Sequence, residues 1–233
     1  KKRAGSRTPQ VALVGYTNAG KSTIMNQMVE RYGDNPAKKV LEKDMLFATL
    51  ETAIRTIESG DNKPFFLADT VGFIHKLPHG LVKAFQSTLE EVKYADLLVQ
   101  VVDFSDSHYK QPMEVTAQTL KELEAGDIPM IYVYNKADLA GVEQLPKVRE
   151  QQIYMSAVNG IGIEELAKMI QDKVYAGHVT GEFLIPYQKG SIASYFCDNA
   201  KVLIQEYRED GMYMQVECYR QEIQRCREYC TSE

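Results

Sequence analysis

The feature that most constrains the fold of this chain is the octapeptide GYTNAGKS at residues 15–22, which fits the pattern GxxxxGK(S/T). A short apolar run at residues 11–14 precedes it, and a helical pattern over residues 22–30 follows it. Glycines let such a turn wrap around a phosphate, and the backbone N–H groups with the helix N-terminus supply positive potential. The sequence therefore predicts a phosphate-binding loop (P-loop), in which Lys21 reaches the β- and γ-phosphates and the Ser22 hydroxyl binds Mg²⁺.

Short apolar runs alternate with longer helical patterns along most of the chain. The strand-like runs lie at residues 11–14, 65–68, 97–102, 130–134 and 153–155, and the helical patterns at residues 22–30, 79–94, 115–123 and 163–174. Strands that alternate with helices are typical of βαβ units, in which helices cover both faces of a mostly parallel sheet. We therefore predict an α/β fold of three layers.

The pattern changes near residue 178, which suggests a second, smaller domain. We expect a basic N-terminal tail at residues 1–8, the α/β domain at residues 9–178, a linker at residues 179–186 and a small α+β domain at residues 187–233. In the last of these, a helical pattern at residues 191–199 precedes alternating runs at residues 201–207 and 212–218, and a further helix follows them. The sequence Asp-Gly between the two runs predicts a β-hairpin.

Composition excludes several classes of protein. Hydrophobic residues make up 44% and charged residues 25% of the 233 residues, as in globular proteins, which argues against a disordered or collagen-like chain. No apolar run is long enough to cross a membrane, and no signal core follows the basic start, so we expect a cytoplasmic protein. A net charge of −5 argues against a protein that coats DNA or RNA with its whole surface, but it allows a local basic patch. We expect the four cysteines, which form no CxxC pair, to be reduced thiols.

A second motif, DTVG at residues 69–72, directly follows the apolar run at residues 65–68. In a P-loop protein, a carboxylate at that strand end holds Mg²⁺, usually through water, and the N–H group of Gly72 can sense the γ-phosphate. A threonine should complete the metal site, and the long polar stretch from residue 32 to residue 45 is a candidate for the loop that delivers it. We favour Thr49, which closes that loop, over its competitor Thr52. The expected metal ligands are Ser22, Thr49 and Asp69.

A third motif, NKAD at residues 135–138, follows the run at residues 130–134 and has the chemistry of a guanine reader. The carboxylate of Asp138 can accept hydrogen bonds from N1–H and the 2-amino group of guanine, whereas adenine would leave it unpaired. Asn135 is expected to brace the loop, and the stem of Lys136 to lie on the base plane. Ser156 and Ala157 follow the next strand and would place a backbone N–H near guanine O6.

The four motifs follow one another in a fixed order, each at the C-terminal end of a strand, where open α/β sheets bind ligands. Together they predict a P-loop NTPase with a Ras-like G domain that switches between GTP and GDP and uses Mg²⁺. The residues expected to contact the nucleotide are Gly15, Asn18, Ala19, Gly20, Lys21, Ser22, Thr23, Asn135, Lys136, Asp138, Ser156 and Ala157. Those expected to assist hydrolysis are Lys21, Thr49 and Gly72.

The motifs and their flanking residues resemble the HflX family of ribosome-binding GTPases. The resemblance rests on GYTNAGKST at residues 15–23, FATL at 47–50, DTVGFI at 69–74, LPH at 77–79, the helical pattern at 81–91 and, more weakly, IPY at 185–187 and EDG at 209–211. It implies GTP hydrolysis and binding to the large (50S) ribosomal subunit and its rRNA. Members of this family have a further N-terminal domain, so the resemblance also implies that these residues are part of a longer protein.

The residue after the second motif, Phe73, bears on the hydrolysis rate. Ras-like enzymes use a glutamine there to orient the attacking water, which phenylalanine cannot do. We therefore expect slow intrinsic hydrolysis by a monomer, with the catalytic group coming from elsewhere in the chain or from a partner. The resemblance implies stimulation by the 50S subunit; a K⁺ ion held with the help of Asn18 is the alternative, unless Asn18 only braces the loop. A nucleotide-dependent interaction module with little turnover and a P-loop phosphotransferase stay open as other functions.

Overall fold

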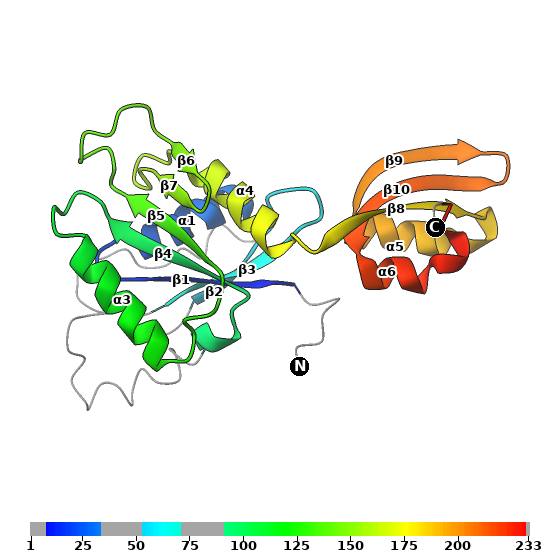
Figure 1. Ribbon diagram of the computed structural model, residues 1–233. Helices are drawn as coiled ribbons and strands as arrows, with labels where there is room; N and C mark the ends of the chain where they lie inside the picture. The colour runs from blue at the N-terminus through cyan, green and yellow to red at the C-terminus, as the bar shows by residue number, and fades with distance from the viewer. Residues whose placement is uncertain (1–7, 34–52, 71–90, 232–233) are drawn as a thin grey trace. The chain divides into compact units, whose positions relative to one another are not determined.

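The computed structural model describes residues 8–33, 53–70 and 91–231, which form two compact units (Figure 1). The first comprises Pro9–Glu58 and Phe65–Lys173, and we call it the α/β unit. The second comprises, of the described residues, Thr8, Ser59–Pro64 and residues 174–231, and we call it the C-terminal unit. The expected helix at residues 79–94 and most of the polar stretch at residues 32–45 fall outside the described residues, apart from a short 3₁₀ helix, η1 (Glu91–Tyr94).

The α/β unit is built on a seven-stranded sheet with the order β2-β3-β1-β4-β5-β7-β6. Its strands are β1 (Gln10–Gly15), β2 (Ala53–Ile57), β3 (Phe65–Asp69), β4 (Leu97–Asp103), β5 (Met130–Asn135), β6 (Lys147–Arg149) and β7 (Gln152–Tyr154). The five strands from β3 to β7 in that order run parallel, and β2 and β6 pair antiparallel at the two edges. The predicted mostly parallel α/β sheet is therefore confirmed.

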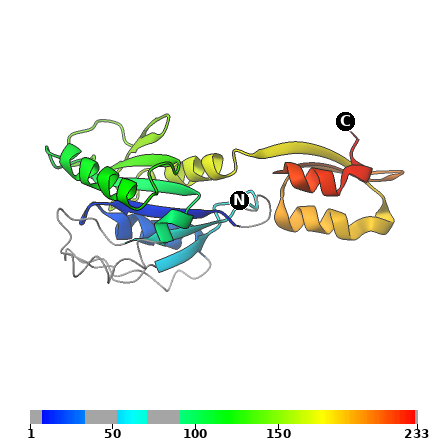
Figure 2. The ribbon, with the colours of Figure 1, turned by 60° about the horizontal axis from the view of Figure 1, so that its bottom comes forward.

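Helices cover both faces of this sheet. They are α1 (Lys21–Tyr32), α3 (Lys110–Glu122) and α4 (Ile163–Val174). Figures 1 and 2 show α1 and α3 on opposite faces, which gives the three layers. Ile24, Met25 and Met28 of α1 are fully buried. Leu120 of α3 packs in a separate cluster with Ala12 and Val14 of β1 and Leu98 of β4. Because the central strands are covered on both faces, they are continuous apolar runs rather than alternating ones.

The C-terminal unit contains a three-stranded antiparallel sheet with the order β8-β10-β9. Its strands are β8 (His178–Ile185), β9 (Lys201–Arg208) and β10 (Gly211–Tyr219), and its helices are α5 (Gly190–Asn199), α6 (Arg220–Arg225) and the 3₁₀ helices η2 (Tyr187–Lys189) and η3 (Arg227–Tyr229). Phe183, Phe196, Met214, Val216 and Cys218 form its core. The linker expected at residues 179–186 is wrong. Gly181, Phe183 and Ile185 are buried at every second position, as in a half-buried strand.

Residues 59–64, which connect β2 to β3 along the chain, belong to the C-terminal unit. The side-chain amide of Asn62 donates to the carbonyl oxygens of Cys197 at 2.7 Å and of Ala200 at 3.0 Å, at the C-terminal end of α5. The carbonyl groups of a last helical turn lack partners within the helix, so Asn62 acts as a C-terminal cap supplied from a distant segment. Among the residues placed by the structure, no helix is both long and apolar enough to span a membrane.

Candidate nucleotide-binding site

The predicted site residues lie at the carboxyl ends of four parallel strands. The segment from the end of β1 to the first turn of α1 carries Gly15, Asn18, Ala19, Gly20, Lys21, Ser22 and Thr23. Asp69 is the last residue of β3. The end of β5 and the residues just after it carry Asn135, Lys136 and Asp138, and the residues that follow β7 include Ser156 and Ala157. Because β3, β1, β4, β5 and β7 are successive neighbours in the sheet, these strand ends share one edge. Thr49, Gly72 and Phe73 fall outside the described residues.

The P-loop has a backbone that needs glycine where it enters α1. Gly20 has a φ of 99°, in the left-handed region, and a Cβ atom there would collide with the side-chain amide of Asn135. Asn18, also left-handed with a φ of 59°, has an exposed side chain. The loop therefore presents its backbone N–H groups at the N-terminus of α1, where an anion binds favourably.

Lys21 is buried within the P-loop, with 7% of its surface exposed. Its ammonium group donates to the carbonyl oxygens of Tyr16 at 2.9 Å and of Gly15 at 3.2 Å. Burial lowers the pKa of Lys21 to about 8, although the negative charge of Asp69 acts in the opposite direction. A buried amine with a lowered pKa gains from an anion beside it, because the anion stabilises the charged form.

Ser22, in the first turn of α1, and Asp69, at the end of β3, come together. The Ser22 hydroxyl donates to the Asp69 carboxylate at 2.6 Å, and Asp69 is fully buried. The next residue, Thr70, donates its hydroxyl to the carbonyl oxygen of Leu13 at 2.6 Å, which fixes the end of β3 against β1. A hydroxyl and a carboxylate are the oxygen donors that Mg²⁺ prefers, so this pair fits the ion. Within the described residues, no group of three or more His, Cys, Asp or Glu side chains is arranged to hold a metal ion.

Asn135 connects three of the loops. Its amide nitrogen donates to the carbonyl oxygen of Ala19 in the P-loop at 2.9 Å, and its amide oxygen accepts from the backbone N–H of Ala157 at 2.9 Å. The side chain is 3% exposed, and both of its polar atoms are thus paired. This one residue thus links the P-loop to the loop that follows β7.

Lys136 forms an ion pair with Asp103, the last residue of β4, at 2.6 Å. Ser105 donates to the other carboxylate oxygen of Asp103 through its hydroxyl at 2.5 Å and its backbone N–H at 3.0 Å. Burial alone would raise the pKa of Asp103, but these hydrogen bonds and the charge of Lys136 outweigh it and hold the pKa below its usual range. The ion pair orients Lys136, whose own backbone is left-handed with a φ of 59°.

Two residues of this arrangement were missed by the sequence analysis, Asp103 and Asn159. Asn159 donates to the carboxylate of Asp138 at 3.2 Å and to the hydroxyl of Ser156 at 2.9 Å. One available signal for Asp103 is its place at the end of an apolar run, the same place that Asp69 has after β3. Asn159 carries no comparable signal, because it lies in a polar loop beyond the motif.

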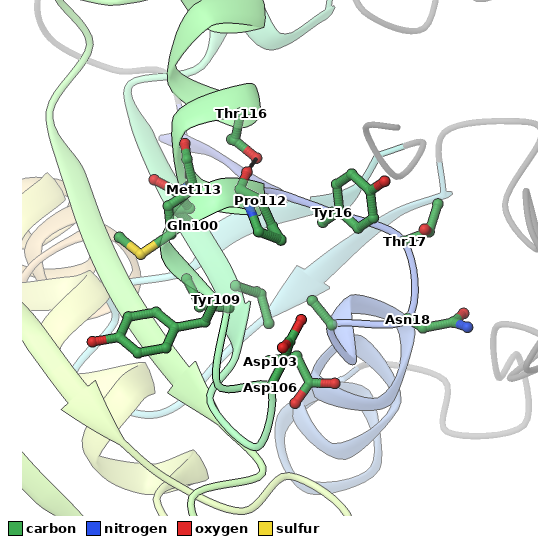
Figure 3. A pocket seen from close by; sticks show the side chains of 13 residues that line it. Tyr16, Thr17, Asn18, Gln100, Asp103, Asp106, Tyr109, Pro112, Met113 and Thr116 are labelled. Carbon is green, nitrogen blue, oxygen red and sulfur yellow. Dashed lines mark hydrogen bonds between the residues drawn. The ribbon is translucent and has the colours of Figure 1, made fainter. Parts of the chain in front are cut away.

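A cavity of about 260 Å³ lies beside the P-loop (Figure 3). Tyr16, Thr17 and Asn18 of the P-loop line one side, and Pro112, Met113 and Thr116 of α3 line the other. Asp103 and Asp106, after β4, line it as well. The cavity therefore adjoins both the P-loop and the residue that holds Lys136.

The sequence profile of the 50S ribosome-binding GTPases matches residues 10–136. The chain belongs to this family. It is 38% identical to the GTPase HflX of Caldanaerobacter subterraneus subsp. tengcongensis over 231 residues, 99% of this chain and 52% of that protein. It is 35% identical to the GTPase HflX of Escherichia coli K12, over 90% of this chain and 49% of that protein. These relatives confirm the resemblance to HflX, and the chain spans about half of their length.

Solved structures agree with the fold. A GTP-binding protein from the archaeon Sulfolobus solfataricus in complex with GDP has a TM-score of 0.56 and 25% identity, over 72% of this chain and 53% of that one. Era from Aquifex aeolicus, bound to GDP.AlF4⁻, has a TM-score of 0.56 and 22% identity, over 72% of this chain and 57% of that one. The predicted P-loop GTPase fold is thereby confirmed for the α/β unit.

Proposed function

We propose that this protein binds GTP and GDP, hydrolyses GTP to GDP and phosphate as a slow molecular switch, and acts as a monomer on the 50S ribosomal subunit and its rRNA in the cytoplasm. The observation that carries the proposal is the double hydrogen bond of Asn135, which joins the P-loop to the two loops expected to read guanine. Membership of the 50S ribosome-binding GTPases and the similarity to proteins named GTPase HflX support the same function.

Each loop has a distinct part in this proposal. Lys21 and the N-terminus of α1 bind the phosphates, and Asp138 reads guanine, with Lys136 against the base and Ala157 near O6. Ser22 and Asp69 hold Mg²⁺, which neutralises phosphate charge when bound. Thr49 and Gly72 contact the γ-phosphate, as the sequence analysis predicts.

The role of Asp138 is tested by changing the base that it can pair with. Asp138→Asn exchanges an acceptor for a donor, and xanthine has an oxygen where guanine has its 2-amino group. We expect this variant to shift its preference from GTP towards xanthosine triphosphate by at least tenfold, measured by competition against a fluorescent nucleotide. Unchanged guanine selectivity would contradict the base-reading role.

Because Phe73 cannot orient the attacking water, we propose that a partner supplies the group that does. The experiment measures multiple-turnover GTP hydrolysis with and without 50S subunits, together with co-sedimentation in GTP and GDP. We expect stimulation by 50S subunits and GTP-dependent co-sedimentation, with Lys21→Ala as the inactive control. The absence of both would defeat the ribosomal role, and nucleotide-dependent binding without turnover would favour an interaction module instead.

A bound K⁺ ion is the alternative to a contribution from the 50S subunit, because its positive charge can assist hydrolysis. Asn18 is exposed and left-handed at the rim of the P-loop, where its side-chain oxygen can face a cation beside the phosphates. We expect hydrolysis to slow when Na⁺ replaces K⁺, and Asn18→Ala to remove the difference between the two salts. Equal rates in both salts would eliminate the cation.

A further inference from the structure

The loop that follows β7 is closed on itself. The backbone N–H of Ser156 donates to the carbonyl oxygen of Ile161 at 3.2 Å, and the N–H of Ile161 donates back to Ser156 at 3.0 Å. Within this ring, the N–H of Gly160 donates to the carbonyl oxygen of Ala157 at 3.1 Å. The six residues 156–161 therefore form a compact turn, and Asn159 lies within it.

The side chain of Asn159 connects this turn to the NKAD loop. Its amide nitrogen donates to the Asp138 carboxylate at 3.2 Å and to the Ser156 hydroxyl at 2.9 Å. A side-chain amide has two N–H donors, and both are used here. Asn159 thus connects the carboxylate expected to read guanine to the loop expected to face guanine O6.

The position of the turn does not depend on Asn159 alone. Arg31, at the end of α1, donates to the carbonyl oxygen of Gly160 at 2.7 Å, and the N–H of Ala157 donates to Asn135. Together with the Ser156–Ile161 bridge, these bonds anchor the turn on both sides. Removing the Asn159 amide should therefore release the Asp138 carboxylate and leave the loop in place.

Asp138 needs such a restraint because it is exposed. Recognition of guanine requires the two carboxylate oxygens to face N1–H and the 2-amino group together, which fixes the rotation of the carboxylate. A side chain already held in that rotation loses less conformational freedom on binding and discriminates more sharply. A neutral amide is suited to this task. It donates a hydrogen bond to the carboxylate, and it adds no second negative charge that would attract the N–H groups of the base.

We propose that Asn159 is a positioning residue that sets the preference for guanine by holding the Asp138 carboxylate. This inference rests on the proposed function, in which Asp138 reads the base. It assigns part of the base selectivity to a residue outside the four motifs.

The test compares three ligands that differ only in the base. GDP, inosine diphosphate (IDP, which lacks the 2-amino group) and ADP are titrated against the wild type, Asn159→Ala and Asn159→Ser. We expect Asn159→Ala to lower the ratio of GDP to IDP affinity about three- to tenfold, the effect of losing one exposed hydrogen bond to a charged group. ADP binding should stay the same, and Asn159→Ser, which keeps one donor, should fall between the two.

Val158→Ala is the matched control, because Val158 is in the same turn, is 73% exposed and should leave all three affinities unchanged. Thermal unfolding of each variant reports whether the fold is retained. An unchanged GDP to IDP ratio in Asn159→Ala, or an equal loss for all three ligands, overturns the positioning role. A wild type that does not prefer GDP over ADP overturns the proposed function itself, which keeps the two failures distinct.

Discussion

Lys21 is the residue of the candidate site whose acid–base chemistry burial changes clearly. Its ammonium group is buried against two P-loop carbonyl oxygens, and its pKa is lowered to about 8. The charged fraction in the free protein therefore falls from about nine tenths at pH 7 to about a quarter at pH 8.5. Phosphate binds the charged form, so we expect the affinity for GDP to fall about fourfold between these two pH values, measured by titration with a fluorescent GDP.

The control for this pH dependence is Lys21→Arg. Its guanidinium group stays charged across the same range, so the affinity of the variant, although lower, should not change with pH. The same fourfold fall in both proteins would assign the titration to a different group and contradict the role of Lys21.

Asp103 offers a second test at the level of one side chain. Asp103→Asn removes the charge that holds Lys136, so the lysine stem is no longer fixed where the base is expected to lie. We expect GDP binding to weaken about three- to tenfold with little change in thermal stability, because the pair is about one-third exposed on both sides. Asp106→Asn, three residues further on and also beside the cavity, should bind GDP like the wild type. Equal affinities in all three proteins would show that Asp103 does not orient Lys136 for binding.

The motif residues could be predicted from the sequence, whereas the supporting residues Asp103 and Asn159 could not, and the reason is geometric. A motif places its residues by spacing along the chain, and the chemistry of phosphate or guanine limits which residue types fit. Asp103 meets Lys136 because β4 and β5 are neighbours, with Asp103 in register with Asn135. Asn159 meets Asp138 because β7 lies on the other side of β5. Both contacts depend on the order of strands in the sheet, which local spacing does not encode.

Strands whose residues are nearly all buried were predicted from the sequence close to their actual bounds. β4 is a run of six buried residues with one half-buried residue at its end, and it was predicted nearly to its bounds. β6 was missed because all three of its residues are exposed, so it shows no hydrophobic pattern. The linker was misplaced because Thr180, Gly181 and Glu182 weaken the apolar alternation of β8, although pairing with β10 along its whole length forms the strand.

The close packing of Gly20 against Asn135, between β1 and α1, can be tested by adding a Cβ atom to the glycine. Gly20→Ala introduces strain at a φ of 99° and a collision with the Asn135 amide, which joins the P-loop to the loops expected to read guanine. Gly141→Ala introduces similar strain at a φ of 71°, but nothing lies within 4 Å of its Cβ. We expect Gly20→Ala to lose at least tenfold in GDP affinity and to unfold at a lower temperature than Gly141→Ala. Equal behaviour of the two variants in calorimetry and binding would contradict the close packing of Gly20 on Asn135.

On the scale of the whole molecule, the C-terminal unit is made of segments more than a hundred residues apart in the chain. Lys63, at the end of the turn between β2 and β3, pairs with Glu217 of β10 at 2.7 Å, and these side chains are 11% and 27% exposed. Asp61 pairs with Lys201 at 2.7 Å, with 54% and 31% exposed. The turn therefore contributes polar contacts to a unit whose described strands and helices all lie after residue 174.

Asn62 is the residue of this turn whose loss should matter most. Asn62→Ala leaves the carbonyl groups of Cys197 and Ala200 without their side-chain donor, and we expect this loss to destabilise the C-terminal unit by about 1 kcal/mol. Such a change lowers the unfolding temperature of a unit of this size by roughly 5 °C, and faster amide exchange at the end of α5 should accompany it. Asp61→Ala is the matched control, since it removes an exposed ion pair that is worth little. If the two variants unfold alike, the turn does not cap α5 in solution, and residues 59–64 contribute only surface charge to the C-terminal unit.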